Sequence, residues 1–316
     1  MQKVFVVDAD DKPLLPCHPA RARKLLDSGK AVVVSVIPFT IKLNRSVDNP
    51  TGSFTVGIDD GAKQVGVSIV NDKTNEVVFK GQIELRQDVS LLMEKRRNYR
   101  RARRYRKTRC RKSKFNNRTG AKILPSIRCR KDSIVRFIKD MSKRVRVTKA
   151  IVEEVKFNHA KHGYGNWFSL VEVGKSYLFN RLRCLGLTIE VVQGHKTKQW
   201  RIAIRLSKQH SRDAIAIVCQ KAAPAIACKE WLIKPRGTKI WAGNPTKTCE
   251  EKNSFRHYDI VVAEHRTRGW VIGSIRSLKA RVITLRTVFS DNFAVSYKKT
   301  RLLWRPKGLI YLTVVS

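Results

Sequence analysis

Four side chains in this sequence combine residue types and positions that suit metal-dependent phosphodiester chemistry. Asp59 and Glu153 each follow directly on a short apolar run, and Asp213 lies three residues after His210 at the expected start of a helix. Carboxylates at strand ends and at a helix start can meet at one edge of a sheet, where Mg²⁺ finds the oxygen ligands that it prefers. Two such ions could hold the attacking and leaving oxygens of an in-line displacement.

Each of these residues also has an ordinary structural explanation. Asp59 could begin a turn, because Asp and Gly follow it. Glu153 and Glu154 could be solvated charges at the end of a strand. His210 and Asp213 could favour the first turn of a helix. Their order on strand, strand and helix favours a shared site, in which a neutral His210 orients or deprotonates the attacking water.

The elements that would position these residues can be predicted from local patterns. Three strands with turns between them form an antiparallel meander that begins with Asp59 at the end of its first strand. These strands are expected at 54–59, 65–70 and 77–85. Further on, helices are expected at 131–142, 168–185 and 211–220, and strands at 150–152 and 187–192. This mixture predicts an α/β fold.

The charge of the chain indicates a polyanionic partner. There are 66 Lys and Arg residues against 25 Asp and Glu, a formal net charge of +41. Such an excess repels itself in a compact chain unless a polyanion neutralises it, and nucleic acid is the natural candidate. No apolar run reaches the roughly 18 residues of a membrane span, and no signal-peptide pattern is present. The sequence therefore predicts a cytoplasmic nucleic-acid-binding protein with no membrane partner.

Residues 91–118 are the most basic part of the sequence. They contain ten Arg and four Lys but one acid, Glu94, which favours a long basic helix over a disordered basic arm. Seven of the arginines are candidate nucleic-acid contacts, as are three cations near the C-terminus. These candidates are Arg96, Arg97, Arg100, Arg101, Arg103, Arg104, Arg106, Lys298, Lys299 and Arg301.

The seven cysteines contain no Cys-x-x-Cys pair, which argues against a disulfide framework or a structural zinc site. Residues 1 to about 45 have the pattern of a small α/β module, and after about Lys229 short strands and turns suggest a β-barrel-like unit.

Several segments together resemble IscB, a family of transposon-encoded RNA-guided nucleases. Three of them are similar to the family's split RuvC motifs: FTVGIDDGAKQVG at 54–66, AIVEEVKF at 150–157 and KQHSRDAIA at 208–216. PLLP at 13–16 resembles the family's "PLMP" module, residues 91–118 its Arg-rich bridge helix, and AVSYKKTRLL at 294–303 its target-interacting domain. The family pattern Glu-x-Val-Lys-Phe selects Glu153 over Glu154, and Asp60 stands where the family often has Pro.

One departure from IscB indicates which relative the chain resembles. IscB proteins carry an HNH domain between the second and third RuvC motifs, whereas only residues 154–209 separate Glu153 from His210 here. His159 and His162 are the candidates for an HNH metal site in that stretch, and a basic loop explains them better. The chain is therefore similar to IsrB, the relative without HNH, which implies a nick in the displaced non-target DNA strand.

The resemblance implies an RNase H-like (RuvC) core with two Mg²⁺ ions, or Mn²⁺ as a substitute, held by Asp59, Glu153, Asp213 and His210. Its implied partners are a guide RNA and double-stranded DNA. It also implies a protein monomer within a ribonucleoprotein, located in the prokaryotic cytoplasm and associated with the nucleoid when bound to DNA. The alternatives are an unguided RNase H-like resolvase or transposase, and an inactive RNA-binding protein.

By this resemblance the chain divides into five parts. They are the PLMP-like module at 1–50, RuvC part I at 51–90, the bridge helix at 91–118, RuvC parts II and III at 119–228, and a β-rich target-interacting or RNA-interacting domain at 229–316.

Overall fold

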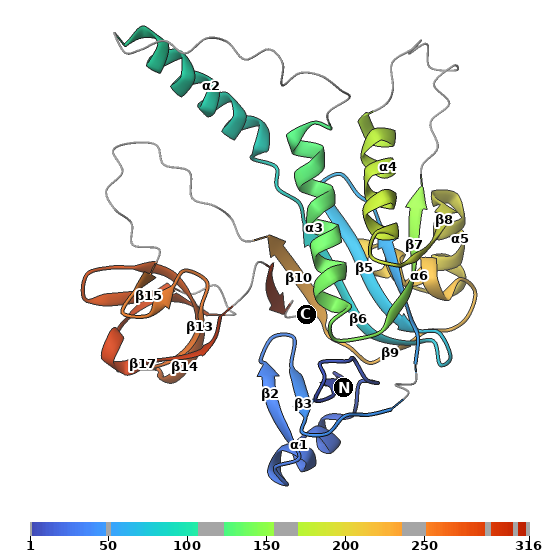
Figure 1. Cartoon of the computed structure of the whole chain (residues 1–316), viewed down its shortest axis with the longest axis horizontal. Helices are drawn as coiled ribbons and strands as arrows, with labels where there is room; N and C mark the ends of the chain where they lie inside the picture. Colours follow the sequence, from blue (N-terminus) through green and yellow to red (C-terminus); the bar gives the residue numbers. More distant parts are fainter. Residues whose placement is uncertain are drawn as a thin grey trace.

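A central sheet with helices on both faces dominates the structure, and a small N-terminal module and a C-terminal β unit lie beside it (Figure 1). The computed structural model describes residues 2–48, 52–106, 123–154, 170–235, 251–287, 292–305 and 309–313. The α/β fold class predicted from the sequence is confirmed.

The central sheet is built from eight strands. In chain order they are β4 (Phe54–Asp59), β5 (Gln64–Asn71), β6 (Glu76–Glu84), β7 (Val147–Glu154), β8 (Thr188–Gln193), β9 (Ala225–Ile226), β10 (Glu230–Pro235) and β18 (Leu309–Thr313). The spatial order is β18-β10-β6-β5-β4-β7-β8, with β9 beside β6. β5 is antiparallel to β4 and β6, whereas β4, β7 and β8 are parallel. From β6 to β8, this is the arrangement of the predicted RNase H-like core.

Helices cover both faces of the sheet because its central strands are apolar on both sides. They are α3 (Pro125–Met141), α4 (Leu170–Arg183), α5 (Gly194–Ala203) and α6 (His210–Cys219). α3 buries Ile134, Phe137, Ile138 and Met141 at helical spacing, in one cluster with α4. α6 packs on the opposite face, where Ile215 meets β5 and β6. Each such buried side chain contributes on the order of 1.5–3 kcal/mol.

The C-terminal region differs from the predicted single β-rich unit at 229–316. Two of its strands, β10 and β18, instead extend the central sheet beyond β6. Trp231 stacks on Phe79 with ring centroids 6.4 Å apart, and Tyr311 meets both rings edge-on. This aromatic cluster explains the outcome, because it buries the two strands in the main core.

Other C-terminal strands form a five-stranded antiparallel sheet in the order β16-β15-β14-β13-β17. They are β13 (Ile260–His265), β14 (Gly269–Leu278), β15 (Val282–Arg286), β16 (Asn292–Ser296) and β17 (Thr300–Trp304). The short pair β11 (Glu251–Lys252) and β12 (Phe255–Arg256) precedes them. Among the described residues no pairing of β16 with β17 closes the sheet, so a complete barrel is not formed there. Residues 236–250 of the predicted β-rich unit lie outside the described residues.

The N-terminal module has its own small core. Its elements are β1 (Phe5–Val7), α1 (Pro19–Asp27), β2 (Ala31–Ser35) and β3 (Thr40–Leu43), with β3 between the other strands. The imidazole of His18 accepts a hydrogen bond from the Ala20 amide and so caps α1, which begins with Pro19 at its preferred position.

The basic segment forms the helix α2 (Val89–Tyr105). This helix points away from the central sheet (Figure 1), and none of its residues is buried. It is shorter than the predicted helix at 91–118: the chain is extended at Arg106, and residues 107–122 lie outside the described part. None of the described helices is long and apolar enough to cross a membrane.

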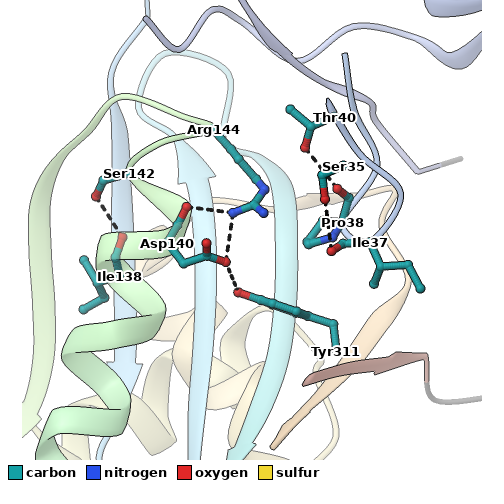
Figure 2. A network of polar contacts seen from close by, with 9 residues as sticks. All are labelled: Ser35, Ile37, Pro38, Thr40, Ile138, Asp140, Ser142, Arg144 and Tyr311. Atoms are coloured by element: carbon teal, nitrogen blue, oxygen red, sulfur yellow. Dashed lines mark hydrogen bonds and ion pairs between the residues drawn. The ribbon is translucent and has the colours of Figure 1, made fainter. Parts of the chain in front are cut away.

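A polar network joins β18 to the end of α3 (Figure 2). The Tyr311 hydroxyl donates to Asp140 Oδ2 at 2.6 Å, and Arg144 Nη1 donates to the Asp140 carbonyl at 2.8 Å while pairing with its carboxylate. Burial raises the pKa of Tyr311 well above its usual value. Across from this network, Ser35 and Thr40 hydroxyls donate to backbone carbonyls and brace the turn between β2 and β3.

Candidate active site

Asp59 and Glu153 lie at the carboxyl ends of β4 and β7, at the same edge of the central sheet. β4 and β7 are parallel neighbours with Ile58 opposite Val152, so the next residue of each strand is one of the two carboxylates. The carboxyl groups of Asp59 and Glu153 lie within hydrogen-bonding reach, which raises the pKa of Glu153 and favours its protonated form. The two acids, distant in sequence, therefore lie in direct contact.

His210 lies beside this pair at the start of α6. Its Nδ1 is 2.5 Å from Asp59 Oδ2. The Asp59 side chain is 12% exposed and the His210 side chain 44%. The imidazole therefore faces both a buried carboxylate and solvent, which is the position that a proton acceptor for an incoming water requires.

Two glycines allow α6 to come this close to the sheet. A Cβ at Gly57 would overlap the carbonyl oxygen of Ala214, and a Cβ at Gly66 would overlap that of His210. On β5, Ser68 lies opposite Gly57, and its Oγ donates to the Ala214 carbonyl at 2.9 Å. The glycines of β4 and β5 thus let the backbone of α6 rest directly on the sheet.

Asp213 completes the group and is paired with Arg201, which no sequence pattern singles out. Arg201 Nε of α5 lies 2.6 Å from Asp213 Oδ1, and both side chains are largely buried. Arg201 stands in a run with Lys196, Lys198 and Arg205. Nothing in that run distinguishes it, because only the packing of α5 against α6 brings it to Asp213.

The neighbours of the two strand-end acids lie elsewhere. Asp60 forms a buried ion pair with Lys131 of α3, so it is directed away from His210. Glu154 has no described contact with the acidic group, whereas Glu153 lies against Gly194 at the start of α5, where a Cβ would come within 2.5 Å of its Oε1. The structure therefore places Asp59 and Glu153, rather than Asp60 and Glu154, at the site.

The buried acids raise one another's proton affinity. Burial, followed by the hydrogen bond and charge of Asp59, raises the pKa of Glu153 to about 8. Burial also raises the pKa of Asp213, against the opposing charge of Arg201. The pKa of His210 is raised, first by its hydrogen bond to Asp59. Without a bound cation His210 thus tends toward the imidazolium, which differs from the neutral ring expected from the sequence.

These side chains suit a hard divalent cation. Three carboxylates and an imidazole lie together, half-buried, and the like charges of the acids need neutralisation. Within the described part of the chain, no group of three or more His, Cys, Asp or Glu side chains is placed to hold a metal ion as it stands. Asp59 is bonded to His210 through Oδ2, which leaves its other oxygen for a cation, whereas Asp213 is paired with Arg201, a contact that a bound cation would replace.

Metal binding is expected to be linked to proton release. The pKa of Glu153, about 8, lies above its ordinary 4.5. The metal-free fold therefore loses stability as pH rises between these values, while the ionised carboxylate becomes available to a cation. We expect Mn²⁺ affinity to rise up to about tenfold per pH unit from pH 6 to 8, measured by paramagnetic resonance titration. Glu153→Gln should flatten this dependence, and a flat profile for the wild type would contradict the assignment.

The predicted nucleic-acid contacts lie on other elements. The seven arginines from Arg96 to Arg106 lie on α2 or directly after it and are exposed. Lys298 and Lys299 lie on a short 3-10 helix, with Arg301 on β17, and all three are exposed. Lys299 Nζ is 3.1 Å from Glu264 Oε2.

The sequence profile of one protein family, described as "RRXRR protein", matches residues 4–172, more than half of the chain. The chain belongs to the RRXRR family. The match includes Asp59 and Glu153 of this RRXRR protein, as well as Arg100-Arg101-Ala102-Arg103-Arg104 on α2, which has the arrangement in the family's name. His210 and Asp213 follow the matched region. No curated protein sequence matches the chain.

Solved structures similar to this RRXRR protein include two of Thermus thermophilus RuvC. One, in complex with a Holliday junction substrate, is 13% identical over 52% of this chain and 90% of RuvC, with a TM-score of 0.32. The other, RuvC itself, is 14% identical over the same shares, with a TM-score of 0.33. A CRISPR-Cas12f ternary complex is 17% identical over 63% of this chain, with a TM-score of 0.29; the match spans about half, 48%, of the Cas12f chain.

Proposed function

We propose that this protein is an RNA-guided DNA nickase with one Mg²⁺-dependent RuvC-type site. The observation that carries the proposal is the contact of Asp59 with Glu153 and His210 at one edge of an RNase H-like sheet, with Asp213 in the first turn of α6. Membership of the RRXRR family and the resemblance of the three motifs to IscB proteins support it.

Asp59, Glu153 and Asp213 would hold the metal, and His210 would lie beside it through its contact with Asp59. Bound Mg²⁺ supplies positive charge to the phosphate oxygens and lowers the pKa of bound water. Asp59 fixes the imidazole through Nδ1, which leaves Nε2 of His210 to accept the proton of the attacking water. Bound metal would offset the negative charges of Asp59, Asp213 and Glu153, which also raise the pKa of His210, and so favour the neutral ring.

The basic surfaces would bind the guide RNA and its duplex with DNA. The arginines of α2 are exposed along the whole helix, and guanidinium groups pair with phosphates in a bidentate manner. In RNA-guided effectors the bases of the guide select the target, and the protein holds the duplex through its backbone. Lys298, Lys299 and Arg301 would contact the flanking DNA or the RNA.

We expect a single cut because the described residues between Glu153 and His210 belong to the core fold and form no second nuclease domain. The described residues there form α4, β8 and α5, which all pack on the central sheet or its helices. Residues 155–169 lie outside the described part. With one nuclease site, the proposed product is a nick in the displaced non-target strand.

The proposal is tested by sequencing the RNA that co-purifies with the protein and programming it against a supercoiled plasmid. We expect Mg²⁺-dependent conversion to the open circle, with the break on the non-target strand and only beside a matching target. Equal cleavage without RNA would instead indicate an unguided resolvase or transposase. Stable RNA binding without Mg²⁺-dependent cleavage would indicate an inactive RNA-binding protein.

Guide RNA is also expected to stabilise the protein. At a formal net charge of +41, repulsion among the cations opposes the compact state, and bound RNA removes it. We expect the midpoint of thermal unfolding to rise by at least about 5 °C with RNA at low salt, and the gain to shrink as salt weakens binding. Equal midpoints at low salt would contradict this expectation.

A further inference from the structure

Glu230, at the start of β10, contacts the residues on both sides of His210. Its Oε1 accepts hydrogen bonds from Gln209 Nε2 at 2.8 Å and from Ser211 Oγ at 2.7 Å. A third donor, Gln82 Nε2 of β6, lies 2.9 Å from the same oxygen. One carboxylate oxygen thus ties the start of α6 to two neighbouring strands of the sheet.

These bonds hold the start of α6, where the N-cap side chain makes no capping hydrogen bond. Gln209 is the N-cap residue of α6, yet its side chain makes no capping hydrogen bond and donates to Glu230 instead. Ser211 is fully buried, so its hydroxyl depends on Glu230 as its acceptor. A negative charge near a helix N-terminus is favourable, and hydrogen bonds to an ionised acceptor are stronger than neutral ones.

The arrangement fixes His210 from both directions. Its side chain reaches Asp59, whereas the side chains before and after it reach Glu230. Its carbonyl oxygen lies against Gly66 of β5, which prevents the first turn of α6 from moving toward the sheet. The backbone of His210 therefore has little freedom to rotate the imidazole away from Asp59.

We propose that Glu230 is a positioning residue that holds His210 in its catalytic orientation. This inference rests on the proposed nuclease function, in which His210 accepts the proton of the attacking water. Glu230 acts through the backbone on either side of His210, without touching the imidazole. Gln82 in turn fixes the carboxylate of Glu230 from the neighbouring strand.

The chain offers a matched control on the same two strands. Glu84 of β6 pairs with Lys234 of β10 at 2.7 Å, so it too is a carboxylate that bridges these strands. Its described partner is this lysine, and α6 is not involved. Glu84→Ala therefore removes a comparable sheet contact and leaves the anchoring of His210 in place.

The first test compares nicking rates of the RNA-loaded protein at saturating Mg²⁺ and DNA. We expect Glu230→Ala to lower the rate constant by about 10- to 100-fold, because small misplacement of a catalytic group is that costly. Glu230→Gln keeps an oxygen acceptor and should recover most of the rate, while Glu84→Ala should match the wild type. Wild-type rates for Glu230→Ala would overturn the inference.

A second test separates positioning from a general loss of structure. In a His210→Ala background, Glu230→Ala should cause little further loss, because a residue that acts through His210 has nothing left to position. The same fold-reduction in both backgrounds would overturn the inference. If Glu230→Ala does not fold, the pair Gln209→Ala and Ser211→Ala removes the same bonds from the helix side, and the same comparison applies.

A third readout does not depend on cleavage. Ring ¹⁵N resonances of His210 should shift in Glu230→Ala and stay unchanged in Glu84→Ala, because only the former frees the imidazole from its fixed orientation. An unchanged His210 ring in both variants would overturn the inference. A wild-type protein that never cleaves DNA would refute the proposed function, whereas wild-type cleavage with an unaffected Glu230→Ala refutes the positioning role alone.

Discussion

Asp59→Ala is expected to abolish Mg²⁺-dependent nicking, with a loss of at least about 10³-fold in the rate constant. Asp59 contacts both Glu153 and His210, so its removal takes away a proposed metal ligand and the partner that orients the imidazole. Binding of guide RNA and target DNA should stay within about threefold of the wild type, because these contacts depend on the basic surfaces. Plasmid nicking and gel-shift titration with the same preparation measure the two effects.

Two other aspartates of the same region serve as controls. Asp72 accepts a hydrogen bond from Thr55 at 2.6 Å, at the opposite end of β4, so Asp72→Ala should nick at nearly the wild-type rate. Asp60→Asn tests the neighbour that pairs with Lys131 and should cost stability more than activity. Nicking by Asp59→Ala at the wild-type rate would refute the assignment of this residue.

Gly66→Ala is expected to destabilise the protein by about 3 kcal/mol or more, which is a large effect for one methyl group. The added Cβ would overlap the carbonyl oxygen of His210, and backbone cannot move aside as a flexible side chain can. Thermal unfolding should shift down by roughly 6–12 °C. Nicking should also fall, because the start of α6 must retreat from β5.

Gly174→Ala in α4 is the matched control for this substitution. Its Cβ would meet only side-chain atoms, Ile127 Cγ2 at 2.9 Å and Lys131 Cε at 3.2 Å. Alanine also favours a helix over glycine by up to about 1 kcal/mol, which offsets the crowding. A Gly66→Ala protein as stable and as active as Gly174→Ala would mean that α6 is not seated on β5 as described.

The parts of the site that depend on local pattern could be predicted from the sequence. Asp59 and Glu153 end apolar strands, and parallel neighbours bring their ends to one edge. His210 and Asp213 stand in the first turn of an apolar helix. The α/β class follows from the same alternation of strands and helices.

The parts that depend on packing between distant segments could not be predicted. Arg201 looks like any cation of a basic run until α5 lies against α6. Glu230 begins β10, which falls within the β-rich region expected at 229–316, and only the pairing of β10 with β6, far away in the sequence, brings it to the central sheet. Tyr311 likewise belongs to the main core only through the aromatic cluster with Phe79.

The central claim is that Asp59, Glu153 and Asp213 bind divalent metal together. Anomalous diffraction from crystals of the RNA-bound protein soaked in Mn²⁺ tests it most directly. We expect Mn²⁺ within about 2.0–2.4 Å of carboxylate oxygens from all three residues, with Arg201 released from Asp213. Mn²⁺ bound only elsewhere, with the Arg201–Asp213 contact intact, would contradict the account.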